Sequence, residues 1–239
     1  MPTLPDFAFV ALFAIAVPLY DYLVFWPATE RRLQADPAGA RMRLWRGAVA
    51  YQWALVAIGA TLWVVAERPW QALGFSVPAG WRLWTAVAAT LLLLLYYVQA
   101  ALAVARDAAT RASVRQQFTG KLARVLPRTR AELTWFGGVA LTAGFCEEFL
   151  FRGYLIWALA PTLSWWGAAA ASLAIFAAGH AYQGWSGVVR TAVVGALFTL
   201  VVAALDSLWP AIILHSLVDL GGGVLAWLAL REEAGAPPA

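Results

Sequence analysis

Charged residues are scarce in this sequence. Only 13% of its 239 residues are Asp, Glu, Lys or Arg, whereas 62% are hydrophobic and the mean hydropathy is +0.70. An ordinary soluble domain carries about 25% charged residues. The composition therefore excludes a typical soluble enzyme and indicates a polytopic membrane protein whose surroundings are the lipid bilayer.

Cysteine is almost absent as well. Cys146 is the single cysteine, which excludes an intrachain disulfide and a cysteine-rich metal site. The sequence also lacks the HExxH signature of many zinc proteases and a glycine-rich phosphate loop. Residues 1–26 lack the basic n-region of a signal peptide, so we expect them to form the first membrane helix.

The small positive charge does not indicate a nucleic-acid partner. The chain has 17 Lys and Arg against 13 Asp and Glu, a net charge of +4. Most of this excess lies in two interhelical loops, residues 27–46 and 106–130. Basic loops of this kind set the topology of membrane proteins, so we expect no nucleic-acid binding.

The apolar runs predict an all-α bundle of seven to eight transmembrane helices. A crossing needs roughly 20 apolar residues. The runs cover residues 7–26, 46–66, 82–105, 133–158, 164–181, 187–205 and 209–230. The fourth run is long and contains charges, so it is either one tilted helix or a helix broken near Gly153, which would make eight.

The two basic loops also predict an orientation. They are separated by two crossings, and the loop between them, 67–82, contains only two basic residues, Arg68 and Arg82. The positive-inside rule places both basic loops in the cytoplasm, the N-terminus outside and, with seven spans, the C-terminus inside. Within the second loop, residues 108–126 could form a short interfacial helix.

The last four spans contain an unusual set of ionisable side chains, which are costly in a membrane unless they are paired or face water. They are Glu147, Glu148, Arg152, His180, His215 and Asp219. Glu148 and Arg152 are four residues apart and are expected to form an ion pair. Glu147 has no obvious local partner, and such a carboxylate can act as a general base or bind a metal.

Both histidines of the protein belong to this set. His180 follows Phe176 by one helical turn, and His215 precedes Asp219 by one turn. Asp219 could accept a hydrogen bond from His215 and fix its tautomer, or both could simply join helices. With Glu147 the set could activate water for amide hydrolysis or bind Zn²⁺, and spacing does not separate these two versions.

The order of these residues resembles a known family. Glu147-Glu148-x-x-x-Arg152, Phe176-x-x-x-His180 and His215-x-x-x-Asp219 resemble, in this order, the three motifs of the CPBP intramembrane proteases. This family comprises the type II CAAX prenyl endopeptidases and the bacteriocin-processing or self-immunity proteins (Abi). The resemblance covers roughly residues 130–230.

The resemblance implies a hydrolase whose catalytic cavity lies inside the membrane and cleaves membrane-associated proteins or peptides. It implies that Glu147 is the water-activating base, that Glu148 and Arg152 support it together with Phe176, that His180 helps to activate water or binds metal, and that His215 and Asp219 are an oxyanion or ligand pair. Members often carry Asn in place of Asp219. Since an ionised Asp cannot donate to an oxyanion, orienting His215 or binding a metal suits it better.

We therefore interpret residues 1–239 as one membrane domain of the prokaryotic plasma (inner) membrane. It would comprise N-terminal helices with a basic linker (7–130), a CPBP-like catalytic core (131–230) and a disordered tail (231–239). The cofactor would be Zn²⁺ or another divalent metal, with a metal-free Glu/His mechanism as the alternative. The alternative functions are a non-proteolytic immunity or partner-binding protein on the same scaffold, or a small proton-coupled transporter.

Straight spans would not assemble this site. They would leave Glu147, His180 and His215 at different depths, with a misfit beyond about 10 Å at 1.5 Å per residue. The sequence therefore predicts a broken fourth segment or re-entrant helices around Gly179, Gly184 and Gly187.

Overall fold

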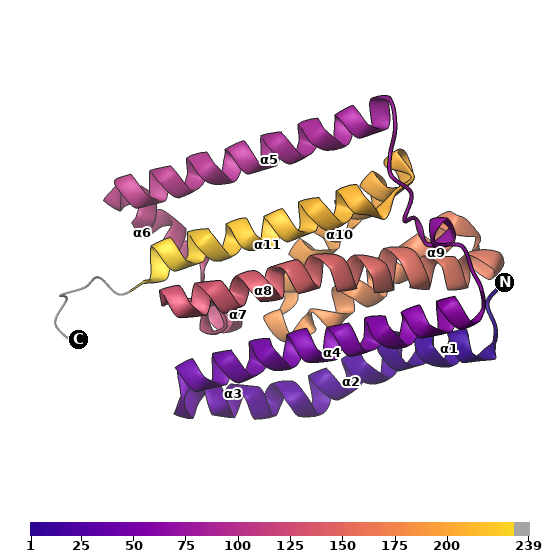
Figure 1. Ribbon diagram of the computed structural model, residues 1–239. Helices are drawn as coiled ribbons and strands as arrows, with labels where there is room; N and C mark the ends of the chain where they lie inside the picture. Colours follow the sequence, from indigo (N-terminus) through magenta and orange to yellow (C-terminus); the bar gives the residue numbers. More distant parts are fainter. Residues whose placement is uncertain (232–239) are drawn as a thin grey trace.

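The computed structural model describes residues 1–231 as helices joined by short turns (Figure 1). No β-strand occurs among these residues, which confirms the predicted all-α fold. Apart from Arg231, the tail predicted to be disordered lies outside the described residues. In chain order the elements are α1 (Leu4–Ala11), η1 (Leu12–Ala16), α2 (Val17–Tyr20), η2 (Asp21–Phe25), α3 (Trp26–Ala35), α4 (Pro37–Val65), η3 (Trp70–Leu73), α5 (Trp81–Arg106), α6 (Ala108–Gln117), α7 (Gly120–Arg124), α8 (Arg130–Glu147), η4 (Glu148–Leu155), α9 (Ile156–Gly179), η5 (Ala181–Gln183), α10 (Trp185–Leu205) and α11 (Leu208–Leu230).

Six helical segments are long and apolar enough to cross a membrane, so the chain is a polytopic helical bundle. They are Leu4–Ala35, Pro37–Val65, Trp81–Arg106, Arg130–Gly179, Trp185–Leu205 and Leu208–Leu230. The fourth has 50 residues, far more than the roughly 20 that a crossing needs. This segment combines the predicted fourth and fifth runs, 133–158 and 164–181.

The break lies at Ser164, whose φ of 60° and ψ of 168° are not helical. There the chain reverses direction, as shown by the hydrogen bond that the Ser172 hydroxyl donates to the Phe151 carbonyl at 2.7 Å. The segment thus contains two antiparallel rods, which correspond to those two predicted runs. The alternative of a break near Gly153 is wrong. Gly153 lies inside the continuous π-helix η4 and allows close packing instead, since an added Cβ would lie 3.2 Å from Leu208 Cδ1.

The predicted basic loops are largely helical. Within residues 27–46, α3 and α4 are separated by Asp36 alone, which caps α4 by accepting from the Gly39 N–H at 2.9 Å. This hydrogen bond holds the pKa of Asp36 below its usual value. The cap's contribution to stability is therefore present at neutral pH and is lost only as the pH falls through the lowered folded pKa.

The interfacial helix predicted over residues 108–126 is divided in two. The helix α6 ends at Gln117, where Phe118 leaves helical geometry with ψ of 87°. Gly120, with φ of +66°, then begins the short helix α7. The single amphipathic stripe that the sequence suggested is therefore interrupted.

Both basic segments lie at the same end of the bundle, as the topology prediction requires (Figure 1). Lys121 of α7 pairs with Glu30 of α3 at 2.9 Å. Leu126, which follows α7, packs with Leu230 at the end of α11. The N-terminus lies at the opposite end (Figure 1).

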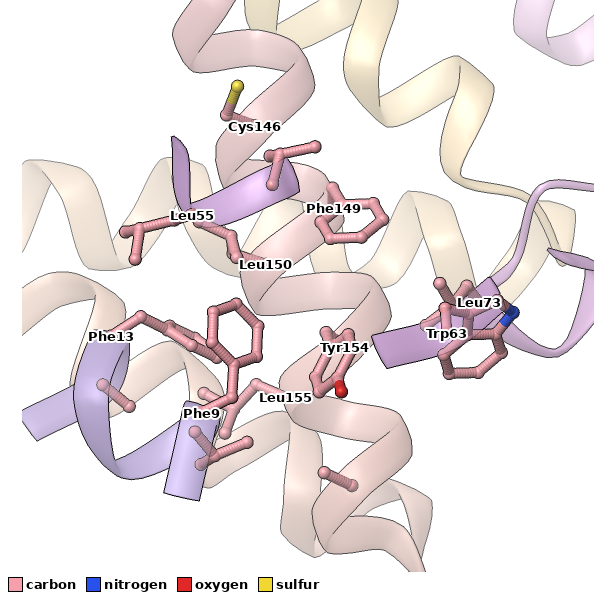
Figure 2. Packing of buried hydrophobic residues seen from close by; sticks show 14 residues of the cluster. Phe9, Phe13, Leu55, Trp63, Leu73, Cys146, Phe149, Leu150, Tyr154 and Leu155 are labelled. Carbon is pink, nitrogen blue, oxygen red and sulfur yellow. The ribbon is translucent and has the colours of Figure 1, made fainter. Parts of the chain in front are cut away.

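A buried aromatic cluster joins the first rod, α4 and η4 (Figure 2). The rings of Phe9 and Tyr154 meet edge to face with centroids 5.0 Å apart. The cluster ends at a polar network in which Arg68 donates to Asp6 at 2.8 and 2.7 Å and the Tyr154 hydroxyl also donates to Asp6. These bonds compensate for the burial of Asp6, whose exposure is 1%. The hydrogen bonds with Asp6 also raise the pKa of Arg68.

The helices α8 and α11 approach each other closely at Gly144. A Cβ added there would lie 2.1 Å from Ser216 Oγ and 2.8 Å from Ser216 N. Only a glycine allows the two backbones to pass at this distance. The contact brings the charged end of α8 against the middle of α11.

Candidate active site

The predicted ion pair between Glu148 and Arg152 is confirmed. Glu148 is fully buried, and Arg152 Nη1 lies 3.1 Å from Glu148 Oε1. Arg152 also donates from Nη2 to the Gly195 carbonyl at 3.1 Å. Its guanidinium lies over the Phe176 ring, 4.2 Å from the centroid. The cation is therefore held by η4, α9 and α10 together.

His215 is oriented by Glu148. Its Nδ1 lies 2.8 Å from Glu148 Oε1, and because an ionised carboxylate can only accept, Nδ1 carries the hydrogen. Its Nε2 faces Glu147 Oε2 at 3.8 Å and Asp219 Oδ2 at 3.6 Å, both beyond hydrogen-bond distance. The orienting role predicted for Asp219 thus falls to Glu148, which the close approach at Gly144 brings next to the ring.

Glu147 has a partner that sequence reasoning missed. Gln52 Nε2 of α4 donates to Glu147 Oε1 at 3.2 Å. The Glu147 side chain is 15% exposed and that of Asp219 is 36% exposed, whereas the Glu148 side chain is fully buried. The one signal for Gln52 was its position as the single amide within the apolar run 46–66.

His180 lies at the end of the second rod of α9. Its Nδ1 is 2.9 Å from the Phe176 carbonyl, which can only accept, so Nδ1 carries the hydrogen and leaves Nε2 free in the neutral ring. The ring packs edge to face on Phe176 at 4.9 Å. Among residues 1–231, His180 makes no hydrogen bond to Glu147, His215 or Asp219.

The reversal at Ser164 brings His180 to the depth of Asp219. The second rod of α9 and α11 are both antiparallel to the segment from α8 through η4, so they run in the same direction. The rings of Phe176 and His215 are 6.4 Å apart. His180 and Asp219 each follow four residues later, about 6 Å farther along.

Part of the predicted irregularity is present. The turn η5, followed by Gly184 with φ of +83°, lies at the predicted glycines. The predicted fourth run is not broken, because the reversal at Ser164 falls between the fourth and fifth predicted runs.

Residues 129–221 match the family model described as "Rce1-like: Type II CAAX prenyl endopeptidase Rce1-like". This part of the chain is therefore similar to the CPBP/CAAX protease family, which supports the predicted resemblance. The match includes all three motifs, as the resemblance implied. The comparisons with curated proteins and with solved structures found no significant match.

The matched segment does not present a ready-made metal site. No group of three or more His, Cys, Asp or Glu side chains is arranged to hold a metal ion within the described part of the chain. The donors predicted for a metal, Glu147, His180, His215 and Asp219, therefore do not fit a resident ion in this arrangement.

The family match leaves α4 outside its bounds, yet α4 contributes to the site through Gln52. Phe198 of α10, inside the match, stacks on the His215 ring with centroids 4.9 Å apart and an interplanar angle of 25°. The sequence analysis predicted neither Gln52 nor Phe198 as a site residue, because neither belongs to one of the three motifs.

Proposed function

We propose that the protein is an intramembrane endopeptidase that hydrolyses peptide bonds of membrane-associated protein or peptide substrates. The observation that supports this proposal most directly is the environment of the Glu147 carboxylate. One of its oxygens is held by Gln52, and the other, 3.8 Å from His215 Nε2, makes no hydrogen bond among residues 1–231. A partly exposed carboxylate with one free oxygen beside an imidazole can serve as a general base.

The first step is the activation of water. Glu147 takes a proton from a water molecule, and the neutral Nε2 of His180 can accept a second hydrogen of that water as a hydrogen bond. The water oxygen attacks the carbonyl carbon of the substrate. A tetrahedral intermediate forms, in which the former carbonyl oxygen carries the negative charge.

His215 is suited to stabilise this oxyanion. When its ring is protonated, Nδ1 donates to Glu148 and Nε2–H is available to the developing charge. Asp219 lies 3.6 Å from the same nitrogen and favours the positive ring that forms. The intermediate then collapses, the C–N bond breaks, and Glu147 returns its proton to the leaving amine.

Glu148, Arg152 and Phe176 support this chemistry without touching the substrate. Arg152 balances the buried charge of Glu148, and Glu148 fixes the His215 ring. Phe176 packs against Arg152, His180 and His215. The arrangement supports a preorganised site, in which the dipoles are in place before the charge develops.

We propose that hydrolysis needs no resident metal, since the donor side chains do not form a site for one. Purified protein treated with a chelator should keep its rate within about two-fold, and elemental analysis should find far less than one equivalent of zinc. A stoichiometric metal whose removal stops hydrolysis, and whose return restores it, would instead support the metalloprotease version.

We also propose that the two basic segments face the cytoplasm of a prokaryotic cell. Their common position at one end of the bundle supports this orientation. Labelling of single cysteines placed at residues 34 and 112, in a Cys146→Ala background, with a membrane-impermeant reagent should succeed only after the membrane is permeabilised.

The experiment that tests the proposed function compares the proteomes of cells with wild-type protein and with Glu147→Gln. An uncleaved membrane-associated precursor should accumulate in the variant alone. Glu67→Gln, an exposed carboxylate in the loop after α4, is the matched control and should behave as wild type. If no precursor accumulates while biological activity persists, an immunity or partner-binding role is favoured. A pH-dependent flux in liposomes that Glu147→Gln abolishes would favour a transporter.

A further inference from the structure

Gln52 is a buried amide in the second span and lies outside the family segment. Its exposure is 8%, and its Nε2 donates to Glu147 Oε1 at 3.2 Å across 95 positions of sequence. Intramembrane polar side chains are costly, so an amide kept there calls for a physical reason.

The position of Gln52 opposite Glu147 is fixed by its neighbour. Trp53 Nε1 donates to Thr142 Oγ1 at 3.2 Å, and the Trp53 ring stacks on Phe145 with centroids 5.3 Å apart and planes 16° apart. Thr142 and Phe145 belong to α8, the same helix that ends with Glu147. These two contacts fix how α4 is rotated and shifted along α8, close to the hydrogen bond between Gln52 and Glu147.

The orientation of the amide also follows from this contact. If the amide were flipped, its oxygen would face a carboxylate oxygen, which is repulsive, so the N–H must point to Glu147. The Gln52 oxygen makes no hydrogen bond within residues 1–231.

We propose that Gln52 is a positioning residue for the catalytic base. Its N–H holds Glu147 Oε1, so that Oε2 is turned toward His215 and the attacking water. A neutral amide does this without adding a charge and favours the ionised form of the base. The inference rests on the proposed function, because Gln52 can position a catalytic base only if Glu147 takes the proton from water.

Three variants of the full-length protein in proteoliposomes test this inference, with a precursor found in the proteome comparison as substrate. Gln52→Leu should lower kcat roughly 10- to 100-fold, as expected for a lost hydrogen bond to a charged group, and leave KM within two-fold. Gln52→Glu places two carboxylates in contact, so the acid limb of its pH–rate profile should move to higher pH by at least one unit. Gln99→Leu, on the exposed face of α5, is the matched control and should behave as wild type.

The outcomes separate the inference from the proposed function. A pH–rate profile of Gln52→Glu that coincides with that of wild type, or a kcat of Gln52→Leu within three-fold of wild type, overturns the positioning role while Glu147→Gln stays inactive. Full hydrolysis by Glu147→Gln overturns the proposed function itself. If Gln52→Leu fails to fold, the nearly isosteric Gln52→Glu decides by its pH profile alone.

Discussion

Glu147→Gln is expected to lower kcat for peptide-bond hydrolysis by at least about 100-fold, the usual share of a general base. Glutamine has nearly the shape of glutamate but cannot take a proton from water. Its amide oxygen can still accept from Gln52, so the contact between α4 and α8 is preserved. Steady-state cleavage by the reconstituted protein measures this, and KM should change little because Glu147 acts on the water and not on substrate binding.

The control for this variant is Glu67→Gln, which removes a carboxylate of the same type outside the bundle. Circular dichroism and thermal unfolding in detergent should give the same result for wild type and both variants. A folded Glu147→Gln protein that cleaves within a few-fold of the wild-type rate would show that another group takes the proton. His180 would then be the next candidate, since its Nε2 is free in the neutral ring.

Arg152→Leu is expected to lower the free energy of unfolding by about 3–5 kcal/mol, because it leaves the fully buried Glu148 without its cation. It also removes one of the two side-chain donors to the Gly195 carbonyl, and the Thr199 hydroxyl remains. For a chain of this size such a loss lowers Tm by an amount on the order of 10 °C. Thermal unfolding of the purified protein in detergent measures it.

A second variant separates charge from packing. In the double variant Glu148→Gln with Arg152→Leu the buried charge is gone, so much of the lost stability should return. Arg82→Leu is the control, because Arg82 and Asp206 form an exposed pair at 3.3 Å that contributes little. Equal losses for Arg152→Leu and Arg82→Leu, or no recovery in the double variant, would contradict the assigned role.

The polar residues of this site fall into two groups that differ in the exposure of their side chains. Glu148, Arg152 and His215 are buried, whereas Glu147 and Asp219 keep part of their side chains exposed. The buried residues hold the His215 ring in place, and the partly exposed residues can contact water and substrate. This division supports hydrolysis more than a purely structural role, in which all costly groups would be paired and sealed.

The amino-acid sequence by itself determined the membrane class, the approximate spans and the identity of the candidate residues. These properties depend on local composition and on spacing within one helix. The Glu148–Arg152 pair is of the same kind, because residues four apart meet on one helical face whatever the rest of the chain does.

Only the tertiary structure decided which groups meet across helices. The contact between Glu148 and His215 depends on the passage of α8 against α11 at Gly144. Gln52 joins the site across 95 residues, a distance at which no periodicity in the sequence carries information. Hydrophobic burial drives such packing but is non-directional, so an apolar pattern alone cannot specify which faces of the helices come together.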